Sequence, residues 1–165
     1  MLFRSQLYKP VFPEPQALLT EIPKVPGTDG RKMSKSYNNT INLSDSDAQV
    51  RAKLKTMVTD PARVRRTDKG NPDVCPVFTL HKSISPKAVI DQVNQQCRTA
   101  AIGCIDCKKL AADALVGRLA PIWEKRRELE QQPKLLDDVI ESGTKRASTV
   151  ARQTMAEVNE AMKIS

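Results

Sequence analysis

The chain has 165 residues, with 27 Lys and Arg against 19 Asp and Glu, a formal net charge of +8 and a pI near 9.5. This length suffices for one main domain with a small appendage, because domains commonly contain about 100 to 200 residues. No apolar run approaches the roughly 20 residues of a membrane span, and no secretion signal is recognisable. We therefore expect a soluble, cytoplasmic protein. The basic charge fits nucleic-acid binding, although simple solubility would give the same charge.

The first 30 residues are rich in proline. Because proline fixes φ and removes a backbone donor, long regular elements are not expected here, and the segment reads as strands and connections of a larger sheet. The following residues 31–39 are polar and lack apolar periodicity, so they predict an exposed loop, which we call the lysine-serine loop. The prolines are Pro10, Pro13, Pro15, Pro23 and Pro26.

The middle of the chain predicts three helices. Residues 44–47 supply N-cap oxygens and negative charge for a first helix, which Asp60–Pro61 ends. Proline at a first turn favours a second helix over residues 71–82 and a third over residues 86–97. A short loop is expected over residues 98–106.

From Lys108 onward, apolar residues recur at spacings of three and four, first as far as Trp123 and again after Pro133. This pattern predicts two long helices, the first with a possible kink at Pro121. Trp123 lies on the apolar stripe, which favours a core position over a base-stacking role. The sequence therefore predicts a mainly α fold containing a helical bundle.

The most specific chemistry lies in the run Lys32-Met33-Ser34-Lys35-Ser36. Two lysines three residues apart can neutralise a triphosphate, and serine hydroxyls with backbone amides can donate to its oxygens. Such contacts are catalytic when pyrophosphate departs and gains charge. Taken alone, the run could equally be a solvated charged turn.

The residues around this run carry a family resemblance. From Pro26 to Ile41 the sequence resembles the KMSKS signature of class I aminoacyl-tRNA synthetases, and its form PGTDGRKMSKSYNNTI is similar to the tryptophanyl branch. The resemblance implies a remnant of a Rossmann-type catalytic domain over residues 1–43, followed by a helical-bundle anticodon-binding domain over residues 44–165.

The same resemblance implies amino-acid activation: ATP with Mg²⁺ and tryptophan give tryptophanyl-adenylate and pyrophosphate, and the tryptophanyl group then moves to tRNA(Trp). Lys32 and Lys35 would hold the pyrophosphate, and the whole run from Lys32 to Ser36 would contact ATP. Gly27, Asp29 and Gly30 would shape the hinge of the loop. Loss of Lys35 should lower the rate more than the ground-state affinity.

The chain departs from the family in one respect. Class I enzymes carry a second signature, HIGH, which is not found here. The one histidine, His81, lies among helical residues and is expected to be a core or surface residue. We therefore expect the carboxy-terminal half of an enzyme, inactive alone, whose full-length form is a homodimer.

Cys75, Cys97, Cys104 and Cys107 are separated by 21, six and two residues. From spacing alone they could bind zinc, bind an iron-sulfur cluster or remain buried thiols. A subset of bacterial tryptophanyl-tRNA synthetases carries a 4Fe-4S cluster on a similar pattern, and this resemblance favours the cluster, with zinc as the alternative. The cluster would hold the neighbouring loop for anticodon reading.

Basic residues recur along the chain, and most are expected on solvated faces, with some contacting tRNA phosphates. One further hypothesis is an RNA-binding module without catalysis, against which the intact lysine-serine loop argues. Another is the related tyrosyl enzyme, against which the cysteines and the PGTDGRKMSKS context argue. The basic residues include Arg63, Arg65, Arg66, Lys82, Lys87, Arg118, Lys125, Arg126, Arg127, Lys145, Arg146 and Arg152.

Overall fold

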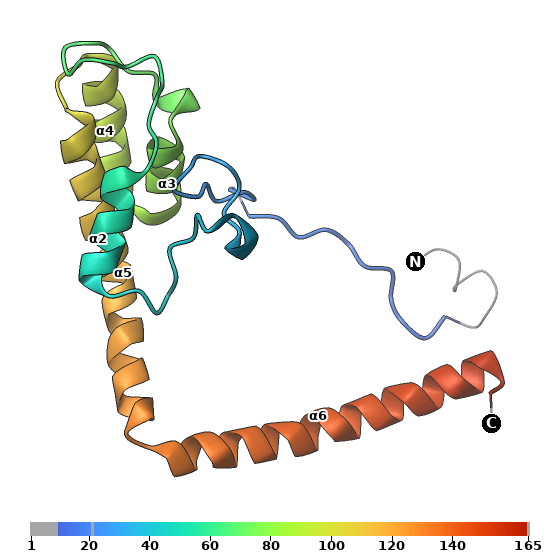
Figure 1. Cartoon of the computed structure of the whole chain (residues 1–165). Helices are drawn as coiled ribbons and strands as arrows, with labels where there is room; N and C mark the ends of the chain where they lie inside the picture. The colour runs from blue at the N-terminus through green and yellow to red at the C-terminus, as the bar shows by residue number, and fades with distance from the viewer. Residues whose placement is uncertain (1–9, 21, 165) are drawn as a thin grey trace. The chain divides into compact units, whose positions relative to one another are not determined.

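A computed structural model describes residues 10–20 and 22–164 (Figure 1). The predicted mainly α class is confirmed: the described residues form no strand, and their isolated bridge joins Pro26 to Lys32. None of the described helices is both long and apolar enough to cross a membrane. The elements are η1 (Lys35–Tyr37), α2 (Asp47–Thr56), η2 (Pro72–Val74), α3 (Pro76–Ile84), α4 (Lys87–Arg98), α5 (Cys104–Glu130) and α6 (Pro133–Met162).

Helix α2 begins where the polar residues predicted it. The Ser46 hydroxyl accepts a hydrogen bond from the Gln49 amide, and the Gln49 side chain accepts one from the Ser46 amide. This capping box satisfies two amides that the first turn leaves without helical partners. The helix then buries Val50 and Leu54 completely.

The predicted single helix over residues 71–82 is wrong, because the structure divides it. The 3₁₀ turn η2 ends at Val74, and α3 starts at Pro76. Cys75 lies between them in an extended conformation, with φ −88° and ψ 117°. A residue that precedes proline is disfavoured in the helical region, so Pro76 forces this break.

The predicted loop over residues 98–106 is shorter than expected. Helix α4 ends at Arg98, Ala100 adopts a left-handed φ of 60°, and α5 already begins at Cys104. The Cys107 amide donates to the Gly103 carbonyl at 2.9 Å and so closes the first turn of α5. Both cysteines of the close pair therefore lie on a helix and not in a loop.

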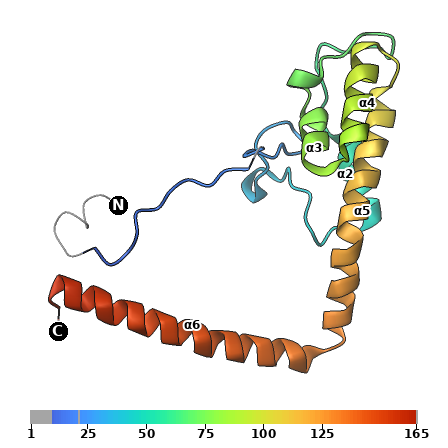
Figure 2. The same cartoon turned by 180° about the vertical axis from the view of Figure 1, so that it is seen from behind.

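Residues 19–126 form one compact unit. Figures 1 and 2 show α3, α4 and the first part of α5 side by side, with α2 against α5. The Arg51 guanidinium binds the Asp113 carboxylate at 2.7 Å across the contact between α2 and α5. The core between these helices contains Val50, Leu54, Met57, Val77, Phe78, Leu80, Ile84, Val93, Ile102, Ala111, Ala112 and Leu119.

Of the described residues, 10–18 and 127–164 belong to a second unit, whose main element is α6. Proline at the first position favours the start of this helix, as predicted. The expected apolar stripe is present, but α6 buries none of its residues, and Val139, Ile140 and Val150 are exposed. The predicted domain boundary between residues 43 and 44 stays a prediction.

Candidate functional site

Asn39 fastens the base of the lysine-serine loop. Its side chain is buried, and its Oδ1 accepts a hydrogen bond from the Ser34 amide at 2.8 Å. Its Nδ2 donates to Oδ1 of Asp29 at 2.7 Å and to the Lys32 carbonyl at 3.3 Å. The Asn39 carbonyl also accepts from the Thr28 amide at 3.0 Å. One buried side chain thus joins both ends of the loop.

Two glycines permit this close packing. A Cβ atom at Gly27 would lie 2.3 Å from Nδ2 of Asn39. Gly30 has a φ of +82°, and a Cβ atom there would lie 2.9 Å from Val58 and 3.2 Å from Pro76. Other residues would be strained at position 30 and would collide at both positions. These contacts support the prediction that Gly27 and Gly30 shape the loop.

The hydrogen bonds around Asn39 also fix the charge of Asp29. The Asn39 hydrogen bond is the largest cause that lowers the pKa of Asp29; burial opposes it, and Arg31 lowers the pKa further. The Arg31 guanidinium binds this carboxylate at 2.7 Å and lies 4.3 Å from the centre of the Tyr37 ring. Asp29 is therefore ionised at neutral pH and holds the loop by charged hydrogen bonds.

The predicted ATP-contacting residues differ in exposure. Lys32, Lys35 and Ser36 are exposed, whereas Met33 and Ser34 are half-buried. Lys35 and Ser36 lie in the 3₁₀ turn η1, which Asn38 ends with a left-handed φ of 51°. The loop therefore presents two cationic side chains to solvent from a firmly held base.

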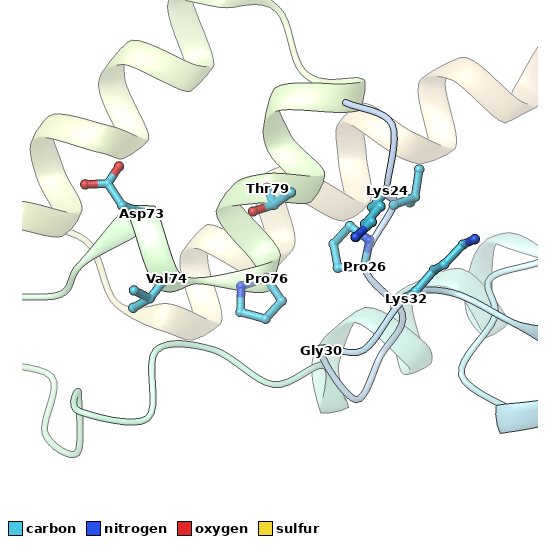
Figure 3. A pocket seen from close by; sticks show the side chains of 9 residues that line it. Lys24, Pro26, Gly30, Lys32, Asp73, Val74, Pro76 and Thr79 are labelled. Carbon is cyan, nitrogen blue, oxygen red and sulfur yellow. The ribbon is translucent and has the colours of Figure 1, made fainter. Parts of the chain in front are cut away.

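A pocket of about 270 Å³ adjoins the loop (Figure 3). Lys24 and Lys32 line one side of it, and Asp73, Pro76 and Thr79 from η2 and α3 line the other. Of the five predicted ATP-contacting residues, Lys32 alone lines this pocket. The loop and the start of α3 thus form one continuous surface.

The four cysteines come from three neighbouring helix ends. Cys75 immediately precedes α3, Cys97 lies in the last turn of α4, and Cys104 and Cys107 lie in the first turn of α5. Burial, together with the charges of the other three cysteines, raises the pKa of Cys107 to about 12, and Arg63 opposes this shift. Burial also raises the pKa of Cys97, while Arg63 opposes this shift. The four predicted residues therefore lie close enough for the charges of the others to raise the pKa of Cys97 and Cys107.

The cysteines do not form a site for a single ion as they stand. Among residues 10–20 and 22–164, no set of three or more His, Cys, Asp or Glu side chains is arranged to hold one metal ion. All four cysteines are free thiols.

His81 is a core residue. It is completely buried, its Nδ1 lies 2.7 Å from the Ser85 hydroxyl, and its Nε2 lies 3.1 Å from the Cys107 carbonyl. Burial lowers its pKa, and the Cys107 carbonyl opposes this shift. The histidine thus joins α3 to the first turn of α5 as a neutral side chain.

Arg63 is one of the basic residues of which most were expected on solvated faces, but it is buried. Its Nη2 donates to the Ile102 carbonyl at 2.7 Å and to the Arg66 carbonyl at 2.9 Å, and its Nη1 lies 3.8 Å from Sγ of Cys97. Its Nε has no hydrogen-bond partner, and no carboxylate of the described residues lies within 4 Å of the guanidinium. This burial could not be predicted from the sequence, because Arg63 stands among other basic residues in a polar connection.

Residues 2–120 match the family described as tRNA synthetases class I (W and Y). The chain is 51% identical to a tryptophan-tRNA ligase of Thermotoga maritima over 97% of this chain and 49% of that protein. It is 43% identical to that of Aquifex aeolicus, over 97% of this chain and 41% of the relative.

Solved structures agree with the sequence comparison. The tryptophanyl-tRNA synthetase of Campylobacter jejuni, complexed with ADP and tryptophan, matches with a TM-score of 0.73 and 25% identity, over 87% of this chain and 44% of that one. The enzyme of Aeropyrum pernix matches with a TM-score of 0.53 and 32% identity, over 58% and 28%. The chain spans about half the length of the curated relatives it matches. By its sequence and its fold, the chain belongs to the family of class I tRNA synthetases for tryptophan and tyrosine.

Proposed function

We propose that the chain serves tryptophan-tRNA ligation, in which ATP and tryptophan form tryptophanyl-adenylate and pyrophosphate before transfer to tRNA(Trp). The observation that carries the proposal is the loop fastened by Asn39, which presents the exposed Lys32 and Lys35. Exposed cations on a fixed base can follow phosphates that gain charge as pyrophosphate leaves. The similar proteins named above are all tryptophan enzymes, which favours tryptophan over tyrosine.

In this proposal, Lys32 and Lys35 are catalytic, and the run from Lys32 to Ser36 contacts ATP with its Mg²⁺. A charge that acts mainly on the departing phosphates stabilises the transition state more than bound ATP. Loss of Lys35 should therefore lower kcat and leave KM nearly unchanged. A full-length homodimer in the cytoplasm completes the proposal.

The test is tryptophan-dependent exchange of pyrophosphate into ATP, measured on the whole enzyme that contains this chain. Lys35→Ala should lower kcat about 100-fold, the cost of removing one transition-state donor. Lys55→Ala, which removes a charge from the exposed face of α2, is the matched control. Equal effects of the two variants, or exchange that requires tyrosine, would contradict the proposal. Binding of tRNA(Trp) without any exchange would favour the non-catalytic RNA-binding module.

We also propose that the four cysteines hold a 4Fe-4S cluster. The donor set suits it, since four thiolates are its usual ligands and each binds a separate iron. A single zinc, the alternative, would need all four sulfurs about 2.3 Å from one point. The buried guanidinium of Arg63, with its unpartnered Nε and no carboxylate nearby, fits a site that carries net negative charge.

When bound, the cluster would cross-link the ends of three helices and contribute folding energy. Its test is anaerobic purification followed by an absorption spectrum with iron and sulfide analysis. About four irons and four sulfides per chain support the cluster. One zinc per chain would support the alternative ligand, and no metal after reconstitution would leave four thiols.

A further inference from the structure

The segment between the lysine-serine loop and α2 is tied down without forming regular structure. Ile41 packs against the core, and Asp45 is buried. Between them, the Leu43 carbonyl accepts a hydrogen bond of 2.9 Å from Nε1 of Trp123. The Leu43 side chain is 65% exposed, so this attachment does not result from packing of its own side chain. The indole hydrogen bond is therefore a separate fastening point.

Trp123 is well suited to hold this position. It is the one tryptophan of the chain, and it packs half-buried against the core from α5. Indole has a single N–H and no acceptor, so the Leu43 carbonyl uses its whole hydrogen-bonding capacity. A large ring with few rotamers can be held in place at small entropic cost. Trp123 is thus the residue of α5 to which the segment at Leu43 is attached.

Helix α5 also carries the neighbouring elements. Asp113 of α5 binds Arg51 of α2, and the Lys108 ammonium donates to the Lys55 carbonyl at 3.1 Å. The segment that follows the loop is attached to α5 at Trp123. Helix α2, into which this segment leads, is attached to α5 at Asp113 and Lys108. At the other end, Asn39 and Gly30 fasten the base of the loop. The exposed lysines lie between Gly30 and Asn39, and Leu43 follows four residues after Asn39.

We propose that Trp123 is a positioning residue for the lysine-serine loop, and that its hydrogen bond to the Leu43 carbonyl keeps Lys32 and Lys35 directed toward the phosphates of ATP. The inference rests on the proposed ATP-dependent function. Asn39 fastens the base of the loop, and the stretch of four residues from Asn39 to Leu43 could extend over about 14 Å if it were free. Fixing its far end removes much of that freedom and raises the fraction of time that the lysines spend near the phosphates.

A role of Trp123 in packing alone can be distinguished from a role of its hydrogen bond by one substitution. Trp123→Phe keeps an aromatic ring in the core and removes the N–H donor. If only packing matters, this variant should behave like the wild type. If the hydrogen bond positions the loop, the variant should affect the loop and leave the helical core unchanged. Ile122→Ala, at the neighbouring and 44% exposed position of α5, is the matched control.

The first measurement is hydrogen exchange on the 165-residue chain. Trp123→Phe should speed exchange of the amides in residues 40–46 about fivefold to tenfold, the effect of one net hydrogen bond, and leave α3 unchanged. The second measurement is tryptophan-dependent pyrophosphate exchange by the whole enzyme. Here kcat should fall about fivefold to tenfold while KM for tryptophan stays within twofold. Ile122→Ala should match the wild type in both.

Each result decides the inference. Faster exchange at residues 40–46 together with a lower kcat supports it. Wild-type behaviour of Trp123→Phe in either measurement overturns it. A wild-type enzyme without tryptophan-dependent exchange would overturn the proposed function itself, and the role of Trp123 toward ATP with it, whatever the amides show. Equally faster exchange in α3 would show that Trp123 acts through packing of the core, and that result would also overturn the inference.

Discussion

Replacement of Asn39 by alanine tests whether one buried side chain fastens the lysine-serine loop. The change removes the acceptor of the Ser34 amide and the donor to the Lys32 carbonyl. It also removes the donor to Asp29, whose carboxylate can be rehydrated, so only the two bonds to backbone groups are counted. At about 1 kcal/mol each, they sum to about 2 kcal/mol, which corresponds to about 30-fold more frequent local opening.

The assay is hydrogen exchange at the Ser34 amide, whose protection depends on the Asn39 side chain. It should become about 30-fold faster, while the amides of α3 should keep their rates. The pKa of Asp29 should also rise toward 3.8, because the Asn39 hydrogen bond is the largest cause of its lowering. Ser36→Ala, on the exposed part of the same loop, is the control. A Ser34 amide that exchanges less than threefold faster would refute the reasoning.

Three further predictions concern the helical unit. Ser46→Ala should destabilise the chain by about 1 kcal/mol through loss of the capping box, measured by thermal unfolding against Ser44→Ala, which lies outside it. Leu54→Ala, at a fully buried site, should cost about 2 to 5 kcal/mol in denaturant titration, whereas Val139→Ala on the exposed face of α6 should stay within about 0.5 kcal/mol. Burial raises the pKa of Asp45, but hydrogen bonds, including one from a neighbouring lysine, lower it to below 3.8 overall. Its stabilisation is therefore complete above pH 3.8 and lost as the pH falls through the folded-state pKa, and Asp45→Asn should flatten this part of the stability curve.

The helices that could be predicted from sequence are those set by local chemistry. The start of α2 follows from a capping box, which needs only residues three apart. The break at Pro76 could also have been read locally, since two prolines four residues apart give two separate starts. The early start of α5 was missed because a cysteine pair spaced for metal binding suggested a loop. Asp106, an acidic residue in the first turn of α5 where negative charge favours a helix start, was the overlooked signal.

In the candidate site, too, some features could be predicted from the sequence and others could not. The motif from Lys32 to Ser36 and the four cysteines are visible as spacing in the sequence. The side chains that hold them in place are not, because their roles depend on contacts between distant residues. Asn39 is a polar residue in a polar loop until the fold buries it, and Arg63 is one arginine among several until Cys97 of α4 and the Ile102 carbonyl lie against it. Trp123 was predicted in the core, but its hydrogen bond spans 80 residues.

The contact of Gly30 with Pro76 has a consequence for how this family can vary. A side chain at position 30 would press on Pro76, whose backbone is joined directly to Cys75. Substitutions at the turn of the loop would therefore be felt at the first cysteine, although the two motifs are 45 residues apart in the chain. A substitution at one motif therefore has to be compatible with the other. We expect the two motifs to change together among relatives, and the transfer of one motif alone from a relative to be poorly tolerated.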